Sequence, residues 1–278
     1  MQRNQMMAWL LFTLWILTAI VGVLHRELGA TPMAVQFGLL ALFVVAHGRT
    51  RYQLSGSLVF VGIVFAVAMI FEMLSIHTGF PFGFFTHSNV FGFKVFEVPL
   101  LVGVAYAGNA YLAWITACIL LNKADKDHSI TGLIGVPVIA AFIVSALDAT
   151  YDPGGSTFAQ YWSFNNPGGY FGVPVSNFIG WLVTSYVFYQ LFALYQRSRK
   201  VEPVESKSWW AMPPILLCVY GLQQPVNLLT LPNVAIVDPH GVTWQSQALF
   251  ETTTLVSVFT VIFCAILAGF LIAQRQTK

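Results

Sequence analysis

The sequence predicts an all-α polytopic integral membrane protein with about eight transmembrane helices. Of its 278 residues, 57% are hydrophobic and only 9% are charged, whereas soluble domains carry about 25% charged residues. Eight apolar runs approach the roughly 20 residues that a helix needs to cross a bilayer. These runs are residues 8–24, 32–47, 56–74, 98–121, 130–149, 173–195, 210–231 and 252–273.

Lysine and arginine placement supports this number of spans and gives an orientation, because cytoplasmic loops retain positive charge. Every second connection between the predicted spans is basic, and the remaining connections hold only Arg26 and Lys94 of the 13 basic residues. The basic connections and ends hold Arg3, Arg49, Arg51, Lys123, Lys126, Arg197, Arg199, Lys200, Lys207, Arg275 and Lys278. We therefore expect both termini to be cytoplasmic, in a multi-pass protein of the cell inner (plasma) membrane.

The chain is expected to form a single membrane domain over residues 1–278. No low-complexity linker and no repeat of fixed period divides it. The first apolar run is expected to be a retained helix, because no small-residue cleavage site follows Leu24.

Acidic residues lie near the outer ends of two predicted spans. Glu72 is near the outer end of the third, Asp148 is near the outer end of the fifth, and Asp152 follows four residues later. Ionisable groups at membrane depth are costly and usually face a cavity or a partner, although Glu72 could also simply meet water at the interface. We expect Pro153 and Gly154 to end the helix, which leaves Asp152 a turn or capping role as an alternative.

The connections on this side are rich in aromatic residues and glycine, in residues 75–85 and 151–181. Trp162 and Tyr170 fit a pocket and a membrane-interface aromatic belt equally well. Asn177 and Trp181 lie one turn apart on a common helix face. Asn177 is either part of a site or a hydrogen-bonding group between helices.

Several reaction classes fit the chain poorly. The six histidines are scattered, without the clusters of a membrane di-iron enzyme, and no lysine lies inside a span to hold retinal. No glycine fingerprint for a dinucleotide is present. Asp148-x3-Asp152 has the form with which intramembrane prenyltransferases hold magnesium diphosphate, but a second such motif and nearby basic residues are missing. A proton-coupled transporter that uses Glu72 and Asp148 is a further alternative.

Three ordered motifs lie between residues 70 and 185. They are Glu72-x4-His77-Thr78-Gly79-Phe80-Pro81-Phe82-Gly83, then Asp148-x3-Asp152-Pro153 followed by Trp162, and Gly169-Tyr170-Phe171-Gly172-Val173-Pro174-x2-Asn177-x2-Gly180-Trp181. In these motifs the chain resembles the CruF-type carotenoid hydratases, which include carotenoid 1',2'-hydratases and bisanhydrobacterioruberin hydratases. That family often has a tyrosine after the Pro-Phe-Gly turn, where this chain has Phe84 and Phe85.

The resemblance implies addition of water to the terminal double bond of a linear carotenoid, giving a tertiary alcohol, without cofactor or metal. Such a reaction needs an acid, stabilisation of a tertiary cation and a positioned water. Glu72 is the expected acid, because an apolar site keeps a carboxylic acid protonated. Asp148 or Asp152 would stabilise the cation and orient the water, with His77 and Asn177 as hydrogen-bonding partners. Ring faces for substrate and cation would come from Phe82, Trp162, Tyr170 and Trp181.

The expected substrate is γ-carotene or lycopene, because the basic loops differ from the acidic loops of salt-adapted proteins; a C50 bacterioruberin precursor is the alternative. Expected partners are the carotenoid in the bilayer, membrane lipid and other carotenoid-pathway enzymes, and no nucleic acid. Five polar residues near the last two spans either line a kinked helix and its outer loop, which we favour, or complete the pocket. They are Gln223, Gln224, Asn227, Asp238 and His240.

Overall fold

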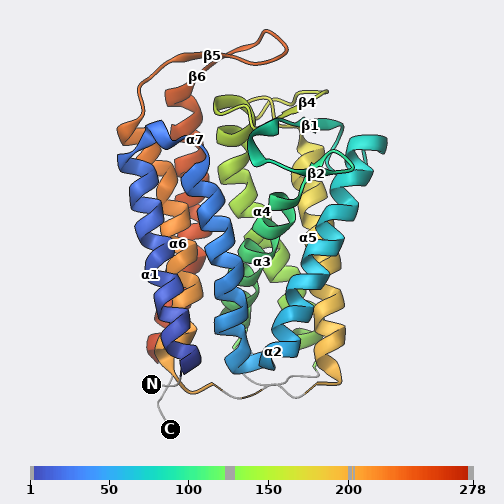
Figure 1. Cartoon of the computed structure of the whole chain (residues 1–278), viewed down its shortest axis with the longest axis vertical. Helices are drawn as coiled ribbons and strands as arrows, with labels where there is room; N and C mark the ends of the chain where they lie inside the picture. Colours follow the sequence, from blue (N-terminus) through green and yellow to red (C-terminus); the bar gives the residue numbers. More distant parts are fainter. Residues whose placement is uncertain (1–2, 123–128, 200–201, 203, 275–278) are drawn as a thin grey trace.

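Helices packed side by side make up most of the molecule (Figure 1). The computed structural model describes residues 3–122, 129–199, 202 and 204–274. Within this part the helices are α1 (Arg3–Leu24), α2 (Thr31–Thr78), α3 (Leu100–Leu120), α4 (Val136–Pro153), α5 (Val175–Arg197), α6 (Lys207–Thr230), α7 (Ser246–Ser257) and α8 (Phe263–Gln274). Short π-helical turns extend α4 at its start (Thr131–Gly135) and at its end (Gly154–Phe158). A third π-helical turn, Val258–Ile262, joins α7 to α8.

Six helical segments of the described chain are long and apolar enough to cross a membrane, which confirms the predicted class of helical membrane protein. They are Gln5–Leu24, Thr31–Thr78, Leu100–Leu120, Thr131–Phe158, Val175–Arg197 and Ser246–Gln274. Helix α6, which carries three prolines and two glutamines, packs beside them.

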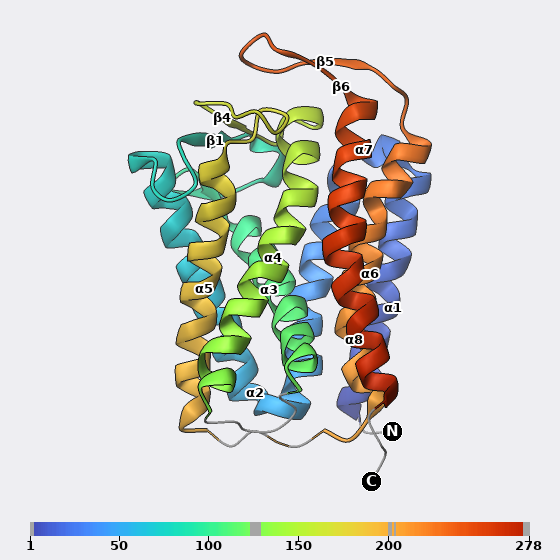
Figure 2. The same cartoon turned by 180° about the vertical axis from the view of Figure 1, so that it is seen from behind.

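Helix α2 covers both the second and the third predicted span. Its 48 residues form two arms that meet at Gln53, where the backbone leaves the helical region (φ 60°). Figures 1 and 2 show the two arms meeting at the end of the molecule where the chain termini lie. The turn that we expected between the two spans is therefore a sharp kink within one helix.

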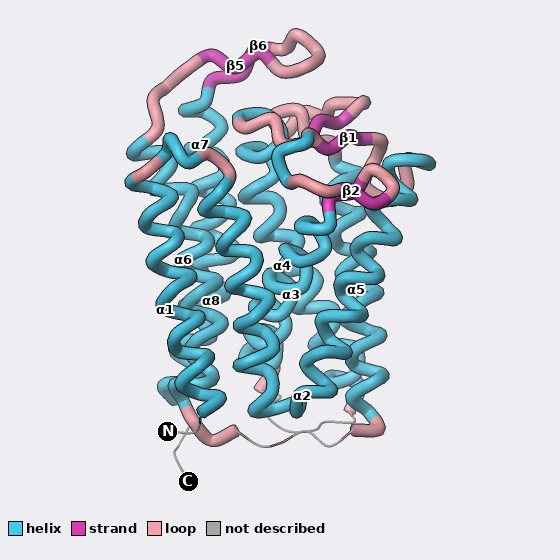
Figure 3. Tube along the Cα trace, in the orientation of Figure 1, coloured by secondary structure: helices cyan, strands magenta, loops and turns pink. Residues whose placement is uncertain are grey.

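Three two-stranded antiparallel sheets lie at the opposite end (Figure 3). Strand β1 (Phe85–His87) pairs with β4 (Trp162–Phe164), β2 (Lys94–Val95) with β3 (Val98–Pro99), and β5 (Ala235–Val237) with β6 (Thr243–Gln245). The first pairing places His87 opposite Trp162. It therefore joins the connection after α2 to the connection after α4.

The prediction that Pro153 and Gly154 end the fifth helix is wrong. Helix α4 runs through Pro153 and continues as the turn Gly154–Phe158. A proline has no N–H to give to the carbonyl four residues earlier; here the hydroxyl of Tyr170 donates to the Ala149 carbonyl instead, at 3.0 Å. Asp148 and Asp152 consequently lie one turn apart on the same helix face.

The described basic residues divide between the two ends of the molecule. Arg49 and Arg51 lie at the kink of α2, and Arg197 and Lys207 lie at the adjoining ends of α5 and α6. Arg26 follows α1 at the other end. Lys123, Lys126, Lys200, Arg275 and Lys278 lie outside the described residues.

Candidate active site

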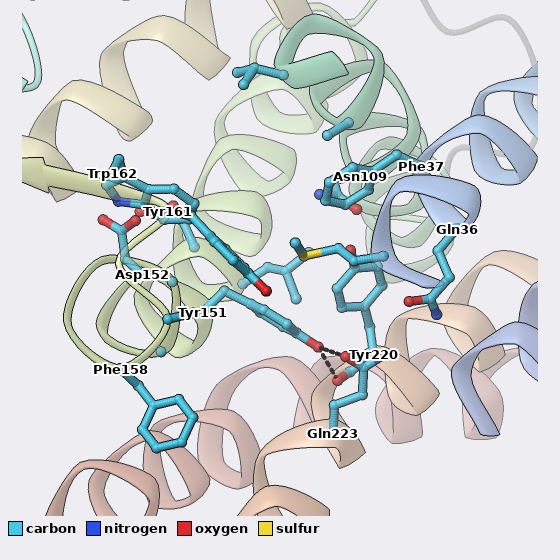
Figure 4. A pocket seen from close by; sticks show the side chains of 18 of the residues that line it. Gln36, Phe37, Asn109, Tyr151, Asp152, Phe158, Tyr161, Trp162, Tyr220 and Gln223 are labelled. Carbon is cyan, nitrogen blue, oxygen red and sulfur yellow. Dashed lines mark hydrogen bonds between the residues drawn. The ribbon is translucent and has the colours of Figure 1, made fainter. Parts of the chain in front are cut away.

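A cavity of about 450 Å³ lies between the helices, near the end that carries the β-strands. Every helix from α1 to α7 contributes to its wall, together with β1 and β4. Figure 4 shows side chains that line it. Glu72, Asp148 and Asp152 all face this one cavity.

Glu72 is held at both carboxylate oxygens. The hydroxyl of Tyr106, from α3, donates to Oε1 at 2.8 Å, and Nε2 of His87, from β1, lies 3.0 Å from Oε2. Glu72 is only 5% exposed. These contacts fix the direction of the carboxyl group.

The two aspartates share one partner, Asn177 of α5. Its amide donates to Oδ2 of Asp148 at 3.1 Å and to Oδ2 of Asp152. The indole of Trp162 lies beside Asp152 and interacts with its carboxylate. Asn177 is buried, and its amide both links α5 to α4 and faces the cavity.

The three carboxyl groups form one electrostatic unit, because Glu72 interacts with both aspartates. Ionised carboxyl groups are costly to bury, and neighbouring negative charges repel. A cluster of this kind can therefore stabilise a cation placed beside it.

Aromatic rings form the wall next to the carboxyl groups. The ring of Trp181 stacks on that of Tyr106, with centroids 4.2 Å apart and planes at 2°. Phe82 and Phe85 extend this wall in contact with each other. The surface is apolar, and its ring faces attract positive charge.

Two glycines allow this wall to pack closely. A Cβ on Gly180 would lie 2.6 Å from the Phe82 ring and 2.9 Å from the Pro81 backbone, and a Cβ on Gly155 would lie 2.2 Å from the Trp162 indole. Ser75 fixes the turn that presents Phe82, since its Oγ donates to the Gly83 carbonyl (2.8 Å) and accepts from the Phe82 N–H (2.9 Å).

Most of the predicted site residues come together here, and two do not. The cavity is lined by Glu72, Phe82, Asp148, Asp152, Trp162, Asn177 and Trp181. His77 is exposed on the last turn of α2, and the histidine next to Glu72 is His87. Tyr170 does not line the cavity; its hydroxyl donates to the Ala149 carbonyl of α4.

The preference for Gln223, Gln224 and Asn227 as residues that only line a kinked helix is wrong, because all three line the cavity. The hydroxyl of Tyr151 lies 2.8 Å from Oε1 of Gln223 and 2.8 Å from the Tyr220 carbonyl. Asp238 and His240 belong to the outer hairpin, as expected for an outer loop. There Nε2 of His240 contacts the Phe164 carbonyl at 2.7 Å.

Asp238 stabilises the turn between β5 and β6. Its carboxylate accepts hydrogen bonds from the N–H groups of His240 and Val242 and from the Trp244 indole, each at 2.9 Å. Burial alone would raise the pKa of Asp238, but these three hydrogen bonds prevail and lower it below its ordinary value.

Comparison with known proteins gives two findings. A family model described as "Carotenoid biosynthesis protein" matches residues 29–238, a range that contains the whole carboxyl cluster and its aromatic wall. The chain is also similar to a bisanhydrobacterioruberin hydratase of Haloarcula japonica, with 28% identity over 189 residues. The matched region is 64% of this chain and 59% of that protein, so the chain spans about three fifths of the relative's length. No solved structure matches the chain.

Proposed function

Because the chain belongs to the carotenoid biosynthesis protein family, we propose that it is a carotenoid hydratase. It would be a cofactor-independent hydro-lyase that adds water to the terminal C1'=C2' double bond of a linear carotenoid end group. The observation that carries this proposal is the cluster of three buried carboxyl groups against an aromatic wall. The hydratase name of the Haloarcula relative agrees with it.

Protonation of carbon is the difficult step. Glu72 donates its proton to C2', which breaks the π bond and leaves a tertiary cation at C1'. Tyr106 stabilises the resulting carboxylate by its hydrogen bond to Oε1, and His87 keeps Oε2 in position. A general acid in such a position accelerates a reaction by about 10²–10⁴-fold.

Capture of the cation completes the reaction. Asp148 and Asp152, held together by Asn177, lie close enough to Glu72 to interact with the cation that it forms. The ring faces of Trp181 and Trp162 add cation–π attraction, worth about 2 kcal/mol in a desolvated site. Water attacks C1', one aspartate accepts the released proton, and return of a proton to Glu72 restores the site.

In the proposed membrane arrangement the protein crosses the bilayer eight times, with each arm of α2 and also α6 as a span. Both termini then lie in the cytoplasm and the carboxyl cluster lies in the outer half of the inner membrane. Support comes from the described arginines and lysines, most of which lie at the end that carries the termini. The carotenoid would enter from the bilayer, supplied by other pathway enzymes in the same membrane.

The proposed substrates are γ-carotene and lycopene, and the alternative is the C50 precursor that the name of the Haloarcula relative indicates. The test is expression in hosts that make each carotenoid, followed by chromatography and mass spectrometry of the pigments. A product heavier by one water should appear with the wild type and not with Glu72→Gln at equal membrane abundance. Unchanged pigments in all hosts, with the protein present in the membrane, would refute the hydratase.

A further inference from the structure

A second polar region lines the same cavity, away from the three carboxyl groups. Gln36 contributes from the first arm of α2, Asn109 from α3 and Gln223 from α6 (Figure 4). We call these three residues the amide cluster. The acid chemistry derived above uses none of them.

The amide cluster has buried hydrogen-bonding atoms that the rest of the described chain does not satisfy. Nε2 of Gln36 and Oδ1 of Asn109 are buried without a hydrogen-bond partner among the described residues, and Gln36 is only 6% exposed. Leaving such buried atoms unpaired destabilises the folded protein. One is a donor, the other is an acceptor, and neither is charged. The ligand that suits both is a neutral hydroxyl oxygen, and buried water commonly fills this role.

Two tyrosines connect the amide cluster to the carboxyl groups. Tyr151 precedes Asp152 in α4, and its hydroxyl reaches Oε1 of Gln223 at 2.8 Å. Asn109 lies one turn from Tyr106 on α3, and Tyr106 donates to Glu72. The amide cluster and the carboxyl groups thus line one continuous cavity, connected through Tyr151 and Tyr106.

The outer end of this region is polar as well. Arg26, an exposed residue that lines the cavity, donates to Oδ1 of Asn227 at 3.0 Å and to Oγ1 of Thr230 at 3.1 Å. Rings such as Phe82 and Phe85 line the same cavity. Water is compatible with the polar surface and a hydrocarbon chain with the aromatic one.

We propose that the amide cluster binds the water that attacks the carotenoid cation, and that this water enters past Arg26. This inference rests on the proposed hydratase activity. The water oxygen forms a bond to C1', its proton passes to Asp152 or Asp148, and the tertiary alcohol results. Without this water the cation loses a proton from the carbon next to C1' to a carboxylate and returns to an alkene.

The test compares alcohol formation with isotope exchange for purified protein and lycopene in D₂O. The variants are Gln36→Met and Asn109→Leu, singly and together. Gln190→Met is the matched control, because Gln190 also has a buried amide atom without a partner among the described residues but does not line the cavity. Thermal unfolding of each variant verifies folding, and the single variants replace the double variant if it does not fold.

We expect at least one amide-cluster variant to lose alcohol formation by tenfold or more while deuterium still enters the recovered lycopene. Gln190→Met should behave as the wild type. Alcohol formation within twofold of wild type in all folded variants would overturn the water site, and so would equal loss of alcohol and deuterium uptake. Because lycopene has no hydroxyl group, a cluster that binds a substrate hydroxyl would give the first of these results. A wild type that forms no alcohol and takes up no deuterium would refute hydration of lycopene, on which this inference rests.

Discussion

The hydroxyl of Tyr106 lies 2.8 Å from Oε1 of Glu72 and donates a hydrogen bond to it. The same tyrosine ring stacks on Trp181. One residue of α3 thus connects the proposed acid to the wall that would receive the substrate, and a small movement of α3 would change both together.

Tyr106→Phe removes this hydrogen bond and keeps the stacked ring. A hydrogen bond to a charged group is worth about 1.5–3 kcal/mol, so we expect kcat for hydration to fall about 10- to 100-fold with little change in KM. Tyr189→Phe is the matched control, because the buried Tyr189 hydroxyl donates to the Ala110 carbonyl. It should lower thermal stability without lowering kcat. Equal kcat in Tyr106→Phe and wild type would remove Tyr106 from the mechanism.

Asp152→Asn is expected to be as damaging as Asp148→Asn, with a loss of about 100-fold or more in hydration rate. The physical reason is that Asp152 is buried inside a continuous helix and shares Asn177 with Asp148. A turn residue at this position would tolerate the change. Activity assays on both variants, matched for amount of folded protein, separate the two cases.

Substitutions of His87 and of His77 should differ sharply in their effects on kcat and on the pH profile. His87→Ala removes the group next to Oε2 of Glu72, and we expect at least a tenfold fall in kcat and a changed pH profile, because a positioning residue acts through the acid. His77→Ala, at an exposed site on the last turn of α2, should leave both unchanged. The opposite pattern would favour His77 as the partner of the acid.

Gly155→Ala tests the packing of Trp162. The added Cβ would come within 2.2 Å of the indole, so Trp162 must move away from Asp152. We expect a large loss of activity with a small loss of stability. At the neighbouring Gly154 a Cβ would meet only Phe250, at 4.0 Å, so Gly154→Ala should be mild. Similar activity of the two variants would show that the position of Trp162 is unimportant.

The outer hairpin should loosen in acid. Because the pKa of Asp238 is lowered in the folded protein, its stabilising effect is complete above its ordinary value of about 3.9 and is lost as the pH falls through the lowered value. The protection of residues 234–246 against hydrogen exchange, expressed relative to the intrinsic exchange rate at each pH, should fall accordingly. In Asp238→Asn the exchange should already be fast at neutral pH; unchanged protection would contradict this role.

The sequence was sufficient to predict the helices, because the length and hydropathy of a span are local properties. Seven of the polar and aromatic site residues were also found, since a carboxyl or amide inside an apolar run is conspicuous. The effect of Pro153 was misread because the hydroxyl of Tyr170, in the connection after α4, donates to the Ala149 carbonyl that the proline cannot reach with an N–H. Rules that use only neighbouring residues in the sequence cannot predict such a contact.

His87 and Tyr106 were missed for related reasons. His87 lies on β1, which pairs with β4, a strand that follows two further helices in the chain. Tyr106 and Asn109 did leave a signal. They are polar groups three residues apart on one face of an otherwise apolar span, which is the pattern that a cavity-lining helix produces.

The most direct test of the proposed chemistry follows the oxygen atom. Purified protein would be incubated with lycopene or γ-carotene in H₂¹⁸O under ordinary air, and in ordinary water under ¹⁸O₂, with mass spectrometry of the alcohol. Addition of water to a cation predicts one ¹⁸O per new hydroxyl in the first experiment and none in the second. Label from ¹⁸O₂, or no alcohol from folded protein, would contradict it.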